Sequence, residues 1–200
     1  MRPSPQKGPL FSAILKQLVT KDGSQRLSLS EFTESAGARG FGLLIGILAL
    51  PSALPVPAVG YSVPFGFMIL LLGLQMLSGR SRPWLPAWAS ALTIKRSTME
   101  KILAFTDRAF HWLERFIHPR FSGFYRRMGL FLGGLVATLM GLLMLTPIPS
   151  TNTLPAIVVV FVALGLTEAD GLLLLLAVVA GVVAILMYSL LIVGMLYVLF

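Results

Sequence analysis

The sequence predicts an all-α, polytopic integral membrane protein in which two proline-broken helical hairpins form one membrane domain. Three observations predict this class. Mean hydropathy is +0.85, and only 12% of the residues are charged, against about 25% in soluble proteins. All 16 lysines and arginines lie at or before Arg127, so the rest of the chain is almost uncharged. Finally, a long apolar stretch interrupted by prolines occurs twice.

The two broken stretches align without a gap at a separation of 92 residues. The alignment matches Pro55 with Pro147, Pro57 with Pro149, Gly73 with Gly165 and Gly79 with Gly171, and it places Gly60 on Asn152. We interpret this pattern as an internal duplication of a broken-helix unit. The first unit covers residues 39–79 and the second covers residues 128–171.

Residues 1–38 form a basic N-terminal segment without the pattern of a secretory signal, so we expect a cytoplasmic N-terminus. Ser28 and Glu31 have the spacing of a capping box, which predicts a short surface helix leading to the membrane. An alternative is that Glu31 and Glu34, just before Arg39, form an ionic gate at the membrane surface.

The first unit consists of two short apolar helices. Residues 41–54 would span roughly 21 Å as a helix, against roughly 30 Å for a hydrocarbon core. The prolines that follow remove amide donors and stop the helix, and residues 65–77 form the second helix. The pair either enters the membrane partway, as a re-entrant hairpin, or crosses it with a non-helical elbow at depth.

Residues 80–127 form a basic connector. Arg80 and Trp84 are typical of a headgroup boundary, and an apolar stripe from Ser97 onward predicts an amphipathic interfacial helix. Arginines also occur in nucleic-acid-binding proteins, but here they flank membrane segments, so we expect no nucleic-acid partner.

The second unit repeats the pattern with a longer first helix, residues 128–146. A second helix at 156–166 follows, with Asn152 or Thr153 as its cap and Pro155 in its first turn. Residues 172–200 are apolar throughout and form either one tilted helix of about 43 Å or a span with a return. Basic residues at both ends of the first unit predict that these ends are cytoplasmic, while the second unit is either parallel or inverted.

Broken membrane helices expose carbonyls that suit cations and amides that suit anions, and transporters built from repeats bind solutes at such breaks. The candidate pathway residues are Pro55, Pro57, Gly60, Tyr61, Ser62, Gln75, Pro147, Pro149, Ser150, Thr151, Asn152 and Thr153. The alternative is that these residues merely cap the half-helices. Glu168 and Asp170 are either proton or cation carriers within the membrane or part of a turn at its surface.

The residues give little support to enzyme chemistry. The chain has no cysteine, no HExxH or GxSxG motif, and both histidines lie in the connector. We therefore expect no catalytic activity, no cofactor and no metal. The expected partners are the bilayer, an ion or small polar solute, and a second copy of the chain in a homodimer.

Several motifs resemble the bacterial ExoD family: LPVP at 54–57, GLQMLSGR at 73–80, PWLP at 83–86, PIPSTNTLPA at 147–156 and ADG at 169–171. The resemblance covers roughly residues 28–190. It implies a protein of the bacterial plasma membrane that is linked to exopolysaccharide production, and it supplies no chemistry. From the residues, our hypothesis is a polar pathway for an ion or a small polar or lipid-phosphate solute. The alternative is a scaffold or regulator of polysaccharide synthesis that acts through the connector.

Overall fold

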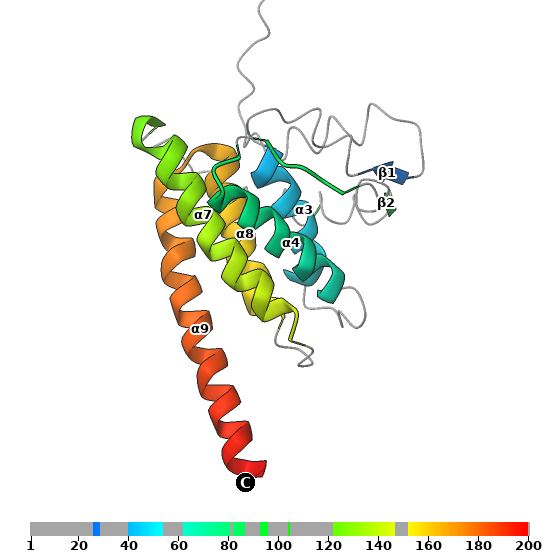
Figure 1. Cartoon of the computed structure of the whole chain (residues 1–200), viewed down its shortest axis with the longest axis vertical. Helices are drawn as coiled ribbons and strands as arrows, with labels where there is room; N and C mark the ends of the chain where they lie inside the picture. Colours follow the sequence, from blue (N-terminus) through cyan, green and yellow to red (C-terminus); the bar gives the residue numbers. More distant parts are fainter. Residues whose placement is uncertain are drawn as a thin grey trace, which may run out of the picture.

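The computed structural model describes residues 26–28, 40–53, 62–80, 82–86, 93–95, 104, 122–146 and 152–199. Within these ranges the chain forms five helices and a two-stranded ribbon (Figure 1). The helices are α3 (Gly40–Ala53), α4 (Ser62–Leu77), α7 (Ser122–Met144), α8 (Thr153–Glu168) and α9 (Gly171–Leu199). The expectation of a helical fold is thus confirmed for the described residues, apart from the short ribbon.

The ribbon was not expected from the sequence. Strands β1 (Arg26–Ser28) and β2 (Thr93–Lys95) pair antiparallel, with Leu27 opposite Ile94. The ribbon ties the segment before the first helix to the connector, a contact between distant parts of the chain that local patterns do not encode. The surface helix expected after Ser28 and the amphipathic helix expected from Ser97 lie outside the described residues.

Helices α4 and α8 begin in the same way. Each has 16 residues, and each carries a proline at its third position, Pro64 and Pro155. Helix α4 starts at Ser62, a few residues earlier than the sequence predicted, and α8 starts directly after Asn152, the expected N-cap position. The reason is that the first amides of a helix have no acceptor within it, so a proline is tolerated in the first turn.

The two helices also end in the same way. Gly79 and Ala169 follow them with positive φ angles of 77° and 55°. The backbone amide after each donates to the carbonyl five residues earlier, at 3.1 and 3.0 Å, which closes the helix in a Schellman motif. The ungapped alignment paired Gly79 with Gly171, but Gly171 is the first residue of α9, and Ala169 has the conformation of Gly79.

Each of the two main helix pairs contains one helix from the first unit and one from the second, which we call crosswise packing. α4 packs mostly on α7, and α3 packs mostly on α8. A Cβ on Gly73 of α4 would lie 2.5 Å from Thr138 Oγ1 and 2.7 Å from Thr138 N of α7, and one on Gly42 of α3 would lie 2.5 Å from Thr167 Oγ1 of α8. Both pairs therefore approach to backbone contact, which is a common packing of helices in membranes.

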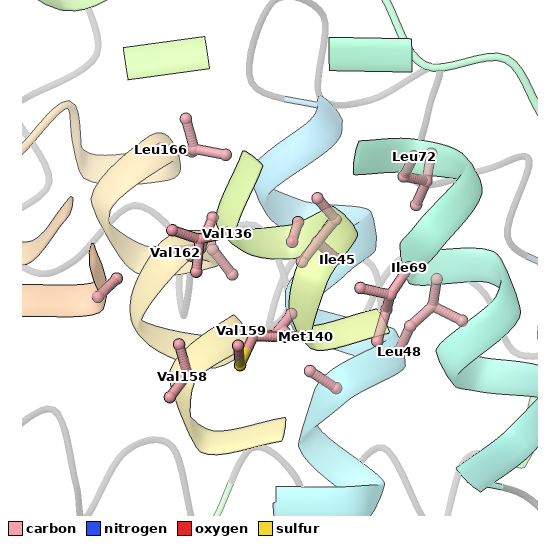
Figure 2. Close-up of a cluster of buried hydrophobic side chains, with 14 of the residues drawn as sticks. Ile45, Leu48, Ile69, Leu72, Val136, Met140, Val158, Val159, Val162 and Leu166 are labelled. Carbon is pink, nitrogen blue, oxygen red and sulfur yellow. The ribbon is translucent and has the colours of Figure 1, made fainter. Parts of the chain in front are cut away.

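The core lies between α3, α4, α7 and α8. Figure 2 shows side chains from all four helices meeting there, among them Ile45, Ile69, Met140 and Val159. Helix α3 is buried on nearly every face, as is usual for a helix that is apolar all round.

Helix α9 leaves the bundle and stays apolar. It is one continuous helix, so the alternative of a span with a return is wrong. Along its second half most large side chains are exposed, Leu190 at 75% and Tyr197 at 88%. Within the described ranges it is the one helix long and apolar enough to cross a membrane, the other apolar helices being shorter.

Candidate functional site

The helix ends beside the two proline breaks lie together at one end of the bundle. In Figure 1, α3 and α7 run down to this end, and α4 and α8 start from it. We call it the elbow end. At the opposite end, which we call the charged end, α4 and α8 end and α9 begins (Figure 1). Glu168 is the last residue of α8, Asp170 directly precedes α9, and Arg80 and Arg82 follow α4. Both helix pairs therefore turn at the same end of the bundle.

Asn152 links three helices at the elbow end. It directly precedes α8, its Nδ2 donates to the Met144 carbonyl at the end of α7 at 3.4 Å, and its Oδ1 accepts from the Tyr188 hydroxyl of α9 at 3.5 Å. These contacts are long, so they orient the amide more than they stabilise the fold. Sequence reasoning did not identify Tyr188, because a single tyrosine in an apolar helix has no distinctive pattern.

The predicted capping role of Asn152 is only half right. Asn152 occupies the N-cap position of α8, but its side chain makes no capping hydrogen bond. Its backbone is helical, with φ −70° and ψ −17°, whereas a capping side chain requires an extended backbone at this position. The amide instead reaches back to the end of α7.

Several backbone groups at the two helix ends of this break are hydrogen-bonded. The last three carbonyls of α7 accept hydrogen bonds from Leu145 N at 3.2 Å, Thr146 N at 3.0 Å and Asn152 Nδ2 at 3.4 Å. At the start of α8, Pro155 has no amide, and the Ala156 amide donates to the Asn152 carbonyl at 3.1 Å. The amides of Thr153 and Leu154 are then the donors that point toward the elbow end.

Ser52 is a polar residue at the elbow end that sequence reasoning missed. It lies in the last turn of α3, its side chain is fully buried, and its Oγ has no hydrogen-bond partner. Of the buried side-chain atoms in the described part of the chain, it is the one left without a partner. A buried hydroxyl without a partner costs about 1–3 kcal/mol. One serine in an apolar helix gave no signal in the sequence.

Gln75 lies away from the other candidate pathway residues. It is near the C-terminal end of α4, at the charged end, and its side chain holds the start of the connector. Its Nε2 donates to the Trp84 carbonyl at 2.9 Å, and its Oε1 accepts from the Trp84 amide at 2.7 Å. The pair of bonds fixes residues 82–86 against the end of α4.

Asp170 and Glu168 also lie at the charged end. Asp170 is fully buried and caps α9, because its Oδ1 accepts from the amides of Leu172 at 2.9 Å and Leu173 at 3.4 Å. Asp170 therefore lies in the turn between α8 and α9, while Glu168 is the last residue of α8.

The remaining predicted site residues lie outside the described residues. They are Pro55, Pro57, Gly60, Tyr61, Pro147, Pro149, Ser150, Thr151, Glu31, Glu34 and Arg39. Ser62 and Thr153 are the first residues of α4 and α8, at the elbow end. Among the residues that the structure describes, no group of three or more histidine or acidic side chains could hold a metal ion.

The described helices form an apolar bundle with many large apolar side chains exposed, and one long apolar helix projects from it. These are features of helical membrane proteins, because soluble proteins rarely expose large apolar surfaces. The particular family follows from comparison with known proteins. The chain belongs to the ExoD family, whose model, described as "Exopolysaccharide synthesis, ExoD", matches residues 11–190. The chain is thus linked to exopolysaccharide synthesis, as the motifs implied.

Two curated relatives support the assignment. The chain is 38% identical over 184 residues to the uncharacterized protein slr1875 of Synechocystis sp. (strain ATCC 27184 / PCC 6803 / Kazusa), covering 90% of this chain and 84% of that protein. It is 30% identical over 167 residues to Protein ExoD of Rhizobium meliloti (strain 1021), covering 81% of this chain and 69% of that protein. No solved structure matches the chain.

Proposed function

We propose that the protein forms a pathway in the bacterial plasma membrane for an ion or a small polar or lipid-phosphate solute. The pathway would use the two proline-broken elbows, and its role in exopolysaccharide production would be transport and not catalysis. In this proposal α9 crosses the membrane, the two helix pairs enter it from the cytoplasmic side, and the protein is dimeric. Its N-terminus is cytoplasmic, and the charged end faces the cytoplasm because its arginines obey the positive-inside rule.

The observation that carries the proposal is the difference in length between α9 and the neighbouring helix α8. Helix α8 has 16 residues, about 24 Å, while α9 starts at the same charged end and has 29 residues, about 43 Å. Helix α9 therefore continues about 20 Å beyond the elbow end and is still apolar and exposed there (Figure 1). If this part of α9 lies in hydrocarbon, the elbow end lies within the membrane.

The crosswise packing supports an internal repeat with a two-fold relation between its units. Exchanging the two units turns the α3·α8 contact into the α7·α4 contact, and these are the two largest interfaces. The matching first turns and Schellman motifs of α4 and α8 fit the same relation. Transporters with repeated units bind their solutes where the repeats meet, next to broken helices.

Polar side chains at the depth of the elbow end are a further observation that supports the proposal. Ser52, Asn152 and Tyr188 lie at or within reach of the elbow end, where Ser62 and Thr153 also lie. Polar groups within a membrane are costly and are commonly tied to function.

The experiment that tests the proposal is flux through purified protein in proteoliposomes. Radiolabelled phosphate, a potassium-sensitive dye and labelled glycerol test an anion, a cation and an uncharged solute in parallel. We expect flux of one solute class, and we expect Asn152→Ala or Pro149→Ala to reduce it at least tenfold while the protein remains folded by circular dichroism. Flux at the level of empty liposomes for all three classes would refute the pathway.

A scaffold role is the second candidate function. The observation that favours it is the pair of hydrogen bonds between the Gln75 side chain and the Trp84 backbone. The two hydrogen bonds to Trp84 hold the start of the connector against α4, while Trp84 stays 57% exposed at the charged end. A scaffold that acts through the connector should lose exopolysaccharide production when Arg108, Arg115 and Arg120 are replaced by glutamine. Under the transport proposal, these changes should matter less than Asn152→Ala.

A further inference from the structure

Gln75, near the end of α4, holds the residues that follow this helix in a closed loop. Its carbonyl accepts from the Arg80 amide at 3.1 Å, and its side chain binds the Trp84 carbonyl and amide at 2.9 and 2.7 Å. Because both are bound to the same residue, the backbones of Arg80 and Trp84 lie close together, and Arg82 lies between them in the chain. We call residues 80 and 82–84 the Gln75 loop.

The Gln75 loop is held in place, but its large side chains are exposed. Leu85, the residue after the loop, packs against the apolar core and fixes the chain a second time. Arg80 and Arg82 are nevertheless exposed, and Trp84 is 57% exposed. Tryptophan is enriched where one side of the ring meets apolar groups and the other meets water, as at a membrane surface or a protein interface.

The exposed charge at this end of the bundle is positive. The acidic residues within the described ranges are Glu168, which is half-buried, and Asp170, which is buried and accepts from the α9 amides. Within the same ranges, neither Arg80 nor Arg82 forms an ion pair. The two guanidinium groups are therefore available to an anionic partner.

The position of the Gln75 loop along α4 favours a lipid as this partner. Leu74 is the last exposed large apolar side chain of α4, and the exposed Ser78 follows one turn, about 6 Å, later. On α9, which begins at the same end (Figure 1), exposed apolar side chains start at Leu172. This change from apolar to polar surface is expected where hydrocarbon meets headgroups. Gln75 follows Leu74 directly, so the Trp84 backbone lies at this boundary.

We propose that the Gln75 loop binds the headgroup of an anionic phospholipid. The guanidinium groups of Arg80 and Arg82 pair with the lipid phosphate, because their planar donors match its oxygens, and the Trp84 ring lies among the headgroups. Gln75 is a positioning residue that acts through the backbone of the loop. A zwitterionic headgroup carries a phosphate and also a cation, so two arginines favour a headgroup with a net negative charge.

This inference takes one element from the proposed function, namely that the charged end lies at a membrane surface. It does not need a pathway at the elbow end. The flux experiment and the lipid experiment described below therefore fail independently. Flux without lipid selection refutes the headgroup site, and lipid selection without flux refutes the pathway.

Quenching of Trp84 fluorescence by brominated lipids shows which lipids lie beside the loop. Trp88 and Trp112 are replaced by phenylalanine, so that Trp84 is the one remaining tryptophan of the chain. This parent variant is reconstituted at full length in vesicles that contain equal amounts of phosphatidylglycerol and phosphatidylcholine. One sample has brominated phosphatidylglycerol, and the other has brominated phosphatidylcholine.

We expect brominated phosphatidylglycerol to quench Trp84 roughly twofold or more as strongly as brominated phosphatidylcholine. The physical reason is that each cation near an anionic membrane surface increases the attraction roughly fivefold. Lipids that mix at random around the loop would quench equally, because the two samples differ only in which lipid carries bromine.

The double variant Arg80→Gln/Arg82→Gln should make quenching by the two lipids equal. Both side chains are exposed, so the variant should keep the circular dichroism spectrum of the parent. The matched control is Arg2→Gln/Lys7→Gln, which removes the same charge from the start of the chain. This control should keep the preference for phosphatidylglycerol.

Gln75→Met tests the positioning role. Methionine has a similar size and helix propensity, so α4 should form, but it cannot make the two hydrogen bonds to Trp84. The net charge does not change. We expect the ratio of quenching by the two lipids to fall toward one, and an unchanged ratio would refute the positioning role of Gln75.

Three results would overturn the headgroup site. If neither lipid quenches Trp84, the loop lies outside the bilayer and its exposed surface is left to a protein partner. Equal quenching in the parent variant would mean that the loop contacts lipid without selecting it. A preference that survives Arg80→Gln/Arg82→Gln would assign the selection to other cations of the chain.

Discussion

At the scale of single residues, glycine and threonine determine how closely the helices pack. Thr138 Oγ1 donates to the Gly134 carbonyl at 2.7 Å, and Thr167 Oγ1 donates to the Ala163 carbonyl at 2.8 Å. Each threonine thus satisfies its own hydroxyl and presents a compact surface to a glycine on the facing helix. Gly73 and Gly42 are those glycines, and a side chain on either would collide with the facing backbone.

Gly73→Ala should destabilise the protein by about 1–3 kcal/mol, because the added Cβ would lie 2.7 Å from a backbone nitrogen that cannot move alone. Chemical unfolding in detergent measures the change. Gly194→Ala is the control, since a Cβ there meets nothing within 4 Å, and it should be neutral or stabilising by up to about 1 kcal/mol. If both substitutions changed the free energy of unfolding equally, the close approach of α4 and α7 at Gly73 would not contribute to stability.

At the scale of elements, the junction between α8 and α9 determines where the long helix begins. The Schellman motif with Ala169 ends α8, and one residue later Asp170 caps α9. The Asp170 amide donates to Gly165 and its side chain accepts from α9, so the same residue serves both helices. The chain therefore changes direction between α8 and α9 within two residues, Ala169 and Asp170.

Asp170→Ala should lower the free energy of unfolding by about 0.5–2 kcal/mol through loss of the cap, while Asp170→Asn should keep most of it because asparagine caps nearly as well. Thermal unfolding and amide exchange at Leu172 and Leu173 measure the effect. Comparison of the two Asp170 variants also separates a capping role from a role in proton transfer. If Asp170→Asn folds normally but removes a pH-dependent flux, Asp170 carries protons as well as capping α9.

At the scale of the whole molecule, the proposed function depends on the depth of the elbow end. Helices α3, α4 and α8 have 14 to 16 residues and α7 has 23. From the charged end α8 reaches about 24 Å, while α9 reaches about 43 Å. A hydrocarbon core is roughly 30 Å thick. The elbow end would then lie within the membrane, near its far side.

Single cysteines test this depth directly, since the chain has none of its own. Ser78→Cys at the charged end should react fast with a membrane-impermeant maleimide added to inside-out vesicles. Ser62→Cys and Thr153→Cys at the elbow end should react slowly with this bulky reagent from either side but faster with a small methanethiosulfonate. Fast maleimide labelling of both elbow-end positions from outside would place them in bulk solvent and contradict the pathway.

The sequence by itself determined where the helices lie and where they break. Apolar length, the missing amide of proline and the position of charge are local properties, so the bounds of α3, α4, α8 and α9 were predicted within a few residues. The β1–β2 ribbon was missed, because pairing between strands so far apart in the chain leaves no local pattern.

The tertiary structure alone decided which surfaces meet. Helices that are apolar on every face, such as α3 and α8, carry no stripe to indicate a partner, so the crosswise pairing could not be read from periodicity. The same reason explains the polar residues. Gln75 holds the start of the connector, Asn152 links helices, and Ser52 has a hydroxyl without a partner. Each of these roles depends on neighbours that only the folded chain supplies.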